Sequence, residues 1–166
     1  AAYLRALLAE QNQQPEQAKT ALKEVTGLID PVPIDFIRYR PQLLMLNGLA
    51  HFGLNEREKA KQYLDAFQRS QGNTPASKLL AQIYLGESNV DKAIDILETY
   101  LKANPADGQA MTLLGSALMS KGHNARAVSL MQQALTTRDN PAFRTVLGLG
   151  LIRSGQPGTG ITQLET

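Results

Sequence analysis

The chain has 166 residues, of which 43% are hydrophobic, a formal net charge of +2 and no cysteine. This length is enough for one domain with a sizeable core. The small charge, without any block of like charges, gives no indication of binding to nucleic acid or to an anionic membrane. The lack of cysteine excludes a disulfide scaffold and a zinc–thiolate site.

An internal period of 33 or 34 residues organises the sequence. Two columns of small residues and one column of turn residues recur at these steps. The small columns are Gly48, Ala81, Gly115 and Gly148, and Ala60, Ala93, Ala127 and Gly160; the turn column is Asn55, Ser88, Gly122 and Gly155. A fourth column holds Leu64, Leu97, Met131 and Leu164. Such self-similarity is typical of a helical repeat protein.

Taken in chain order, the first copy covers residues 1–29 and also fits these columns, with Ala6, Gln13, Ala18 and Leu22. An insertion near 30–40 follows, where the two prolines of DPVPIDFI interrupt helix continuity. The remaining copies cover 41–73, 74–106, 107–140 and 141–166, of which the last is incomplete. Each copy is predicted to form two antiparallel helices, and no stretch alternates convincingly enough for a strand.

Local signals mark several helix ends. Ser88 with Asp91 predicts a capping box for the second helix of the third copy. Two dipeptides place a cap residue before a proline at the first helical position, Thr74-Pro75 and Asn140-Pro141. Two glycines, Gly122 and Gly155, are expected to end helices in the left-handed conformation.

The stretch GLGLIRSGQPGTG, residues 148–160, invites comparison with a phosphate-binding loop. Such a loop follows a strand and is usually followed by a lysine, and this stretch shows neither. We instead assign Gly148 and Gly160 to the small columns. At the corresponding place in the fourth copy, Gly115 and Ala127 are expected to meet where the two helices cross, because only short side chains allow close approach.

These repeats resemble the tetratricopeptide repeat. The fourth copy carries Leu114-Gly115, Gly122, Ala127 and Ala134 where that family has its Leu-Gly, turn Gly and two Ala positions, and the third carries Tyr84, Ala93 and Pro105. The family's early Trp is absent, His51 fills the Tyr position of the second copy, and Phe67 and Tyr100 replace the later Ala. The resemblance implies an all-α, right-handed solenoid of antiparallel helix pairs.

The leucine-rich, glutamine-rich style is also similar to the repeat lipoproteins of bacterial exopolysaccharide and PEP-CTERM protein-sorting systems. That similarity implies a periplasmic or outer-membrane-anchored protein; without it, a cytoplasmic location is expected. The chain starts without Met and stops at Thr166 within a helical pattern, so we interpret it as a piece of a longer protein. No apolar run reaches the length of a spanning helix, and no direct membrane insertion is expected.

In the tetratricopeptide family the first helices line a concave groove that usually binds an extended peptide or a partner helix. Carried over by column, the groove positions in this chain are Met45, Leu49, Phe52, Lys78, Gln82, Leu85, Gln109, Thr112, Ser116, Met119, Thr145, Leu149 and Arg153. One subgroup grips a peptide's carboxylates with Lys and Asn from neighbouring repeats; here Lys78 and Gln82 fill those columns in one copy only. The sequence therefore predicts a groove for a mixed apolar and polar segment of another protein, and the alternative is that these are ordinary solvated or packing residues.

Three other functions are alternatives to protein binding. Catalysis needs a nucleophile, base or metal set within reach, and the two histidines, His51 and His123, occupy a packing column and a turn; we expect no enzyme, metal or cofactor. RNA-reading repeats need a repeating pair of base-reading side chains and phosphate-binding cations, which the columns do not show. A structural spacer, or a scaffold that self-associates through the incomplete last copy, remains open because terminal repeats normally need polar caps.

Overall fold

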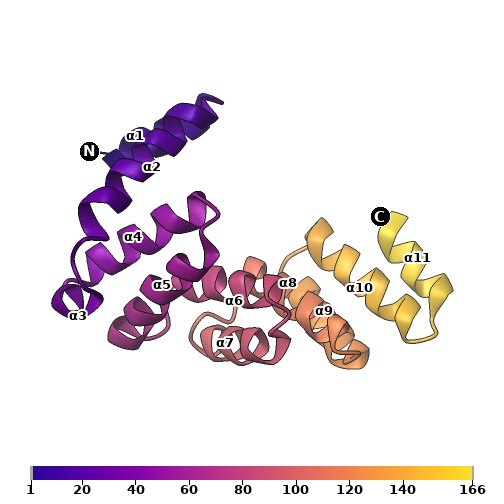
Figure 1. Ribbon diagram of the computed structural model, residues 1–166. Helices are drawn as coiled ribbons and strands as arrows, with labels where there is room; N and C mark the ends of the chain where they lie inside the picture. The colour runs from indigo at the N-terminus through magenta and orange to yellow at the C-terminus, as the bar shows by residue number, and fades with distance from the viewer. Residues whose placement is uncertain (1, 166) are drawn as a thin grey trace. The chain divides into compact units, whose positions relative to one another are not determined.

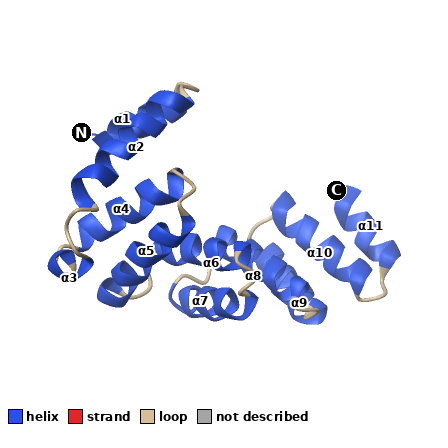
Figure 2. Ribbon diagram, in the orientation of Figure 1, coloured by secondary structure: helices blue, strands red, loops and turns tan. Residues whose placement is uncertain are grey.

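The computed structural model describes residues 2–165, which form eleven helices and no strand (Figures 1 and 2). The all-α prediction is therefore confirmed. The chain divides into an N-terminal unit that ends at Ala76 and a C-terminal unit that begins at Ser77, and each is described by itself. None of the helices described in residues 2–165 combines the length and apolar character that crossing a bilayer requires.

The N-terminal unit consists of two helix pairs and a short helix between them: α1 (Ala2–Gln11), α2 (Pro15–Ile29), α3 (Ile34–Ile37), α4 (Pro41–Gly53) and α5 (Arg57–Gln71). Helix α1 packs on α2, α2 on α4, and α4 on α5 and α3. The core between these helices contains Leu22, Val25, Ile37, Leu44 and Tyr63. Burying such side chains stabilises the unit by about 2 kcal/mol each.

The C-terminal unit consists of three helix pairs: α6 (Ala76–Gly86) with α7 (Val90–Ala103), α8 (Gly108–Ser120) with α9 (Asn124–Thr137), and α10 (Pro141–Arg153) with α11 (Pro157–Glu165). Successive pairs stack through α7 on α8, α9 on α10 and α8 on α10. Two of the repeated columns lie inside in the third and fourth copies, where Ala93, Leu97, Ala127 and Met131 are fully buried, whereas Leu164 of the last copy is 44% exposed. Their periodic spacing is thus the spacing of the core.

The same turn closes each helix pair. Its central residue has a positive φ in all five copies: Gln13 (56°), Asn55 (59°), Ser88 (61°), Gly122 (79°) and Gly155 (83°). In the third copy Asn89 N donates to Tyr84 O at 2.8 Å and Ser88 N to Leu85 O at 3.1 Å, which is the pattern of a Schellman cap. The left-handed caps expected at Gly122 and Gly155 are confirmed.

Helix starts follow the sequence signals only in part. Asn140 caps α10 and accepts a hydrogen bond from Ala142 N at 2.8 Å, as expected. The predicted capping box is wrong, because Ser88 belongs to the preceding turn and the N-cap of α7 is Asn89, which makes no side-chain cap hydrogen bond. Helix α6 begins at Ala76, and the Thr74 hydroxyl is buried without a hydrogen-bond partner.

The glycine-rich stretch forms the α10–α11 pair, which Figure 1 shows side by side at the C-terminal end. A Cβ on Gly160 would lie 2.6 Å from Gly148 O, and one on Gly148 would lie 2.8 Å from Gly160 O. The two backbones therefore approach each other at a distance that only glycine allows. An added Cβ at Gly115 would first meet Val146 (2.9 Å) and Met131 (3.1 Å), and the expected contact with Ala127 stays a prediction.

Candidate functional site: an apolar groove in the N-terminal unit

One face of α4 is hollowed. The hollow measures about 400 Å³ and is lined by Pro41, Gln42, Met45, Leu46, Leu49, Phe67 and Gln71. On α4 they form pairs four residues apart, 41/45, 42/46 and 45/49, so they share one side of the helix. Phe67 and Gln71 also lie four residues apart, on the last turns of α5. The walls are apolar, and two amide side chains supply hydrogen-bond donors and acceptors at the rim.

A second hollow of about 590 Å³ adjoins the first at Leu46, which lines both. Its other lining residues come from α1, α2 and α4: Ala2, Tyr3, Leu4, Val25, Leu28, Ile29 and Leu43. None of the side chains that line either hollow carries a charge. We call the two together the apolar groove; it runs over α1, α2, α4 and the end of α5.

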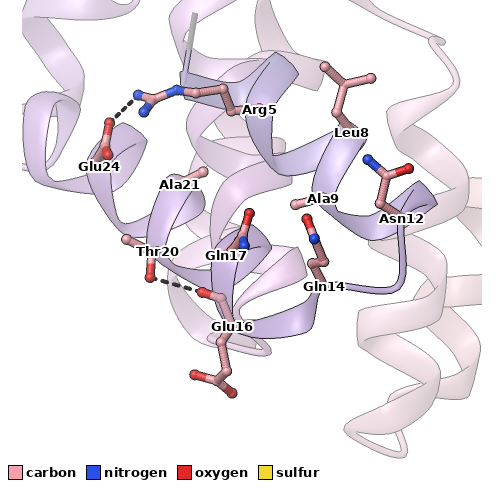
Figure 3. A pocket seen from close by; sticks show the side chains of 10 residues that line it. All are labelled: Arg5, Leu8, Ala9, Asn12, Gln14, Glu16, Gln17, Thr20, Ala21 and Glu24. Atoms are coloured by element: carbon pink, nitrogen blue, oxygen red, sulfur yellow. Dashed lines mark hydrogen bonds and ion pairs between the residues drawn. The ribbon is translucent and has the colours of Figure 1, made fainter.

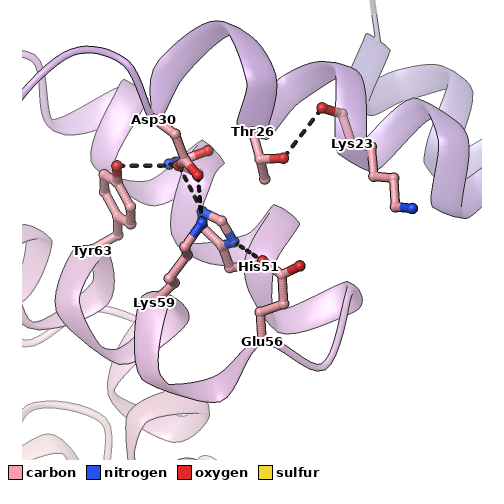
Figure 4. Close-up of polar contacts among 8 residues, drawn as sticks. Lys23, Thr26, Asp30, His51, Glu56, Lys59 and Tyr63 are labelled. Atoms are coloured by element: carbon pink, nitrogen blue, oxygen red, sulfur yellow. Dashed lines mark hydrogen bonds and ion pairs between the residues drawn. The ribbon is translucent and has the colours of Figure 1, made fainter.

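A polar network fixes α4 against α2 and α5 (Figure 4). Its centre is the carboxylate of Asp30 at the end of α2, which accepts from Asn47 Nδ2 at 2.8 Å and from Lys59 Nζ at 2.8 Å. Tyr63 Oη donates to the same carboxylate at 3.3 Å. His51 is fully buried, with Nε2 2.8 Å from Asp30 Oδ1 and Nδ1 2.7 Å from Glu56 Oε2.

The charge of Asp30 is stabilised by this network. Partial burial acts to raise the pKa of its carboxyl group, but the hydrogen bonds from Lys59, Asn47 and His51 outweigh burial and hold the pKa well below its usual range. The imidazole of His51 faces ionisable carboxyl groups on both sides, and only its doubly protonated form can donate to both. The network therefore holds α2, α4 and α5 together and orients the face of α4 that carries the groove.

The C-terminal unit has a related centre at Asp107. Its carboxylate caps α8 by accepting from Ala110 N at 3.0 Å, and it also accepts from Lys78 Nζ and Tyr100 Oη, each at 2.8 Å. Burial raises the pKa of this carboxyl group, but these hydrogen bonds outweigh it and lower the pKa. The Lys78 ammonium group is thus engaged by Asp107 within the unit.

Three groove positions predicted from the sequence lie in the N-terminal unit, on α4. Met45 and Leu49 line the α4 hollow, whereas Phe52 is half-buried and is not among its lining residues. Leu46, Phe67 and the second hollow were not predicted: Leu46 lies on α4 but outside the columns carried over from the family, and Phe67 lies on α5, a second helix. The bulky Phe67 at a position where the family has Ala was the available signal.

The predicted positions of the C-terminal unit differ in accessibility. Gln82, Leu85 and Thr112 are half-buried, and the exposed ones are Gln109, Ser116, Thr145, Leu149 and Arg153. The hydroxyl groups of Thr112 and Thr145 donate to backbone carbonyls of their own helices. Met119 is 8% exposed, and Arg153 Nη1 donates to its carbonyl at 3.4 Å, so this side chain packs between helix pairs.

A third hollow, of about 500 Å³, lies between α1 and α2 and is more polar (Figure 3). The Arg5 guanidinium and the Glu24 carboxylate form an ion pair across it, and Thr20 Oγ1 donates to Glu16 O at 2.8 Å. Three charged side chains line it, Arg5, Glu16 and Glu24, of which Arg5 and Glu24 pair with each other, whereas no charged side chain lines the apolar groove. We therefore take the apolar groove as the candidate site.

Comparisons with known proteins agree with this architecture. A family model described as tetratricopeptide repeat matches residues 45–107 and 78–143, which together are more than half of the chain. Two curated relatives are "DnaJ homolog subfamily C member 7 homolog" of Schizosaccharomyces pombe, 28% identical over 57% of this chain and 19% of that protein, and "ALBINO3-like protein 3, mitochondrial" of Arabidopsis thaliana, 34% identical over 52% and 17%. The chain spans less than a fifth of the length of either.

Solved structures of MamA proteins have the same fold. "MamA MSR-1 C2" superposes with a TM-score of 0.74 at 15% identity, covering 99% of this chain and 91% of that one. "MamA 41-end from Desulfovibrio magneticus RS-1" gives a TM-score of 0.73 at 23% identity, covering 99% and 91%. At these identities the likeness concerns the fold alone.

Proposed function

The chain belongs to the tetratricopeptide repeat family, a fold that serves as a protein-interaction scaffold, and we propose that it is a non-catalytic module that binds an apolar segment of another protein. The observation that supports this is the apolar groove, in which two hollows meet at Leu46 without a charged lining residue. An apolar concavity rimmed by a few polar groups is the usual form of a recognition site.

The chemistry of the lining residues suits a protein segment. Met45 can adapt to irregular apolar side chains because its side chain is unbranched and polarisable. Gln42 and Gln71 can hydrogen-bond to backbone groups of a bound segment. A helix-in-groove mode, with apolar anchors at i, i+3, i+4 and i+7, would place successive anchors in the two hollows.

The polar clusters support a non-catalytic role. Asp30 is held ionised by Lys59, Asn47 and His51, and Asp107 is held ionised by Lys78, the Ala110 N–H group and Tyr100. A general acid or base works best with a pKa near the operating pH, and both carboxyl groups have a lowered pKa. Their role in this proposal is to fasten helices.

We extend the proposal to the C-terminal unit through the predicted positions that remain accessible there. Gln109 and Ser116 on α8, and Thr145 and Leu149 on α10, present uncharged polar and apolar groups. They offer a partner hydrogen bonds and a small apolar contact. For the setting, we propose a bacterial secretion, exopolysaccharide or protein-sorting assembly; the leucine- and glutamine-rich style of the helices supports this.

Self-association through the last helix pair is a second candidate. Helices α10 and α11 leave four large apolar side chains exposed: Leu149, Ile152, Ile161 and Leu164. Burying them against a second copy would be favourable. Sedimentation of the wild type and of an Ile161→Gln, Leu164→Gln variant separates this candidate from groove binding, because the variant should become smaller only if this face joins copies.

The groove itself is tested by affinity capture from the lysate of the source cell. A Met45→Lys, Leu49→Lys variant places two charges in the α4 hollow, and the matched control Gln132→Lys, Thr136→Lys places two on exposed positions of α9, also four residues apart. Circular dichroism and thermal unfolding first establish that both variants fold. We expect a partner that the wild type and the control capture and the groove variant does not; equal capture by all three would refute the groove.

A further inference from the structure

The segment between α2 and α4 interrupts the repeat and is firmly held on one side. Ile37 of α3 is buried, and Ile34 packs on the core of the N-terminal unit. The backbone is ordered by Val32 N donating to Ile29 O at 2.9 Å and Arg40 N donating to Ile37 O at 2.8 Å. The segment is therefore a fixed feature of the surface.

Two aromatic rings stand on the outer side of this segment. Phe36 is 77% exposed and Tyr39 is 78% exposed. Since Ile34 and Ile37 face the core at an interval of three residues, Phe36 cannot turn inward with them. Large aromatic side chains gain much from burial, and Tyr and Phe are enriched at protein interfaces.

Two guanidinium groups accompany these rings. The Arg38 guanidinium lies 4.7 Å from the centroid of the Tyr39 ring, and Arg38 Nη2 donates to Tyr39 Oη at 2.7 Å. Neither Arg38 nor Arg40 forms an ion pair with any residue in the described range 2–165. The carboxylate of Asp30, which precedes the segment in the chain, is bound to Lys59 at 2.8 Å.

We propose that Phe36, Arg38, Tyr39 and Arg40, the aromatic–arginine surface, dock an acidic segment of a protein partner that carries an apolar or aromatic anchor. Partner carboxylates pair with the two guanidinium groups, because Arg offers a planar fork of donors that matches a carboxylate. The anchor packs on Phe36 and Tyr39. Arg38 is already placed over the Tyr39 ring, which reduces the ordering that binding would require.

The charge of this surface favours an acidic protein over a nucleic acid or a membrane. The segment 31–40 holds two arginines and one acidic residue, Asp35, and the whole chain has a net charge of only +2. Nucleic-acid binding depends on several cations that neutralise successive phosphates, and binding to an anionic membrane gains about 1 kcal/mol per cation near the surface. Two cations beside two aromatic rings match a short acidic segment with one anchor.

The test uses two displayed libraries of ten-residue peptides. The acidic library varies each position over Asp, Glu, Phe, Leu, Ser and Gly, and the basic library has Lys and Arg in place of Asp and Glu. We expect the wild-type chain to enrich peptides from the acidic library only. An enriched peptide, labelled with fluorescein and measured by anisotropy, should bind about tenfold more weakly to an Arg38→Gln, Arg40→Gln variant and to a Phe36→Ser, Tyr39→Ser variant.

Control variants separate this surface from the groove. Arg69→Gln removes another exposed arginine, Ile161→Ser removes another exposed apolar side chain, and the groove variant Met45→Lys, Leu49→Lys should keep its affinity for the acidic peptide. Enrichment from neither library or from both would overturn the proposal, as would equal binding by the variants of the aromatic–arginine surface. Stronger binding to a twenty-nucleotide poly(U) RNA or to phosphatidylserine vesicles than to the acidic peptide would overturn it in favour of those partners.

Discussion

The two units each place an aspartate where one helix pair meets the next, but they build different centres around it. Asp30 accepts from Asn47, Lys59 and Tyr63 and lies against the fully buried His51. Asp107 accepts from Lys78, Tyr100 and the first turn of α8. In both units a carboxylate thus accepts hydrogen bonds between successive helix pairs. In the N-terminal unit the buried donors Asn47 and His51 would lose their acceptor if the Asp30 carboxylate were removed.

The surfaces of the two units also differ. The N-terminal unit carries the insertion, the apolar groove and bulky side chains such as Phe67. In the C-terminal unit the last helix pair is packed through Gly148 and Gly160, and the N-terminal unit has a glycine in the same column, Gly48, which packs on Leu64. The units differ instead in the insertion, which projects Phe36 and Tyr39 from the surface, and in Phe67, which lines a hollow that a partner can fill.

The largest effect is expected from removing the two aspartates. Asp30→Ala should lower the free energy of unfolding by about 3–4 kcal/mol, because Asn47 and His51 are buried donors left without an acceptor. Asp107→Ala should cost about 2–3 kcal/mol, including about 1 kcal/mol for the lost cap of α8. Urea unfolding measures both values, and hydrogen exchange should place the first loss in α4 and α5 and the second in α6 to α8. Asp35→Ala, at an exposed site, should change stability by less than about 0.5 kcal/mol; equal costs for all three would refute the special role of the two centres.

The next prediction concerns the close approach of α10 and α11. Gly160→Val should cost about 1–3 kcal/mol, because its side chain would meet the backbone at Gly148 O. Gly158→Ala on the same helix is the matched control; an added Cβ there meets no atom within 4 Å, and alanine should gain about 0.5–1 kcal/mol. Thermal unfolding with hydrogen exchange on α10 and α11 reads out both, and an equal response at the two glycines would contradict the packing described here.

Acid should lower the stability that the carboxyl groups of Asp30 and Asp107 contribute to the fold. Their carboxyl groups have lowered pKa values in the folded state, so the unfolded chain takes up their protons first as the pH falls. The stability they contribute is present above the unfolded pKa of about 3.9 and is lost on acidification through the folded pKa. Each group adds a slope of at most about 1.4 kcal/mol per pH unit between its two pKa values. Urea unfolding between pH 5 and pH 2 should therefore be less steep in pH for Asp30→Asn and Asp107→Asn; an unchanged slope would contradict the assignment.

The smallest effect concerns the turns. Ser88 holds a φ of 61° in a position that Gly122 and Gly155 fill in later copies. Ser88→Gly should raise the free energy of unfolding by about 0.5–1 kcal/mol, because glycine adopts this conformation without steric cost. Gly122→Ala should lower it by a similar amount. Thermal unfolding measures both, and a loss on Ser88→Gly would show that the serine makes a contact that outweighs its backbone strain.

The sequence predicts the fold well, because the repeat columns coincide with the buried core. Ala93, Ala127, Leu97 and Met131 are fully buried, and the turn column adopts a positive φ in every copy. Periodicity reports burial and backbone conformation directly. Helix starts are harder, as Ser88 shows, because the same residue can end one helix or begin the next.

The candidate site is predictable only in part. Met45 and Leu49 follow from the first-helix columns, and both line the α4 hollow. Leu46, Phe67 and the hollow over α1 and α2 depend on how neighbouring helices pack, which no single column encodes. Lys78 shows what its column does not encode: its ammonium group pairs with Asp107, 29 residues away in the chain, and its place in a partner groove stays a prediction.

The central claim is that the groove of the N-terminal unit binds a protein partner. The most direct measurement places the photo-crosslinking residue p-benzoylphenylalanine at Leu49, in the groove, and separately at Gln132, an exposed position of α9, in lysate of the source cell. We predict a discrete protein adduct at Leu49 that the neighbouring Met45→Lys change abolishes, and a weaker adduct or none at Gln132. No adduct at Leu49, or an adduct there that survives Met45→Lys, would contradict the groove as the binding site.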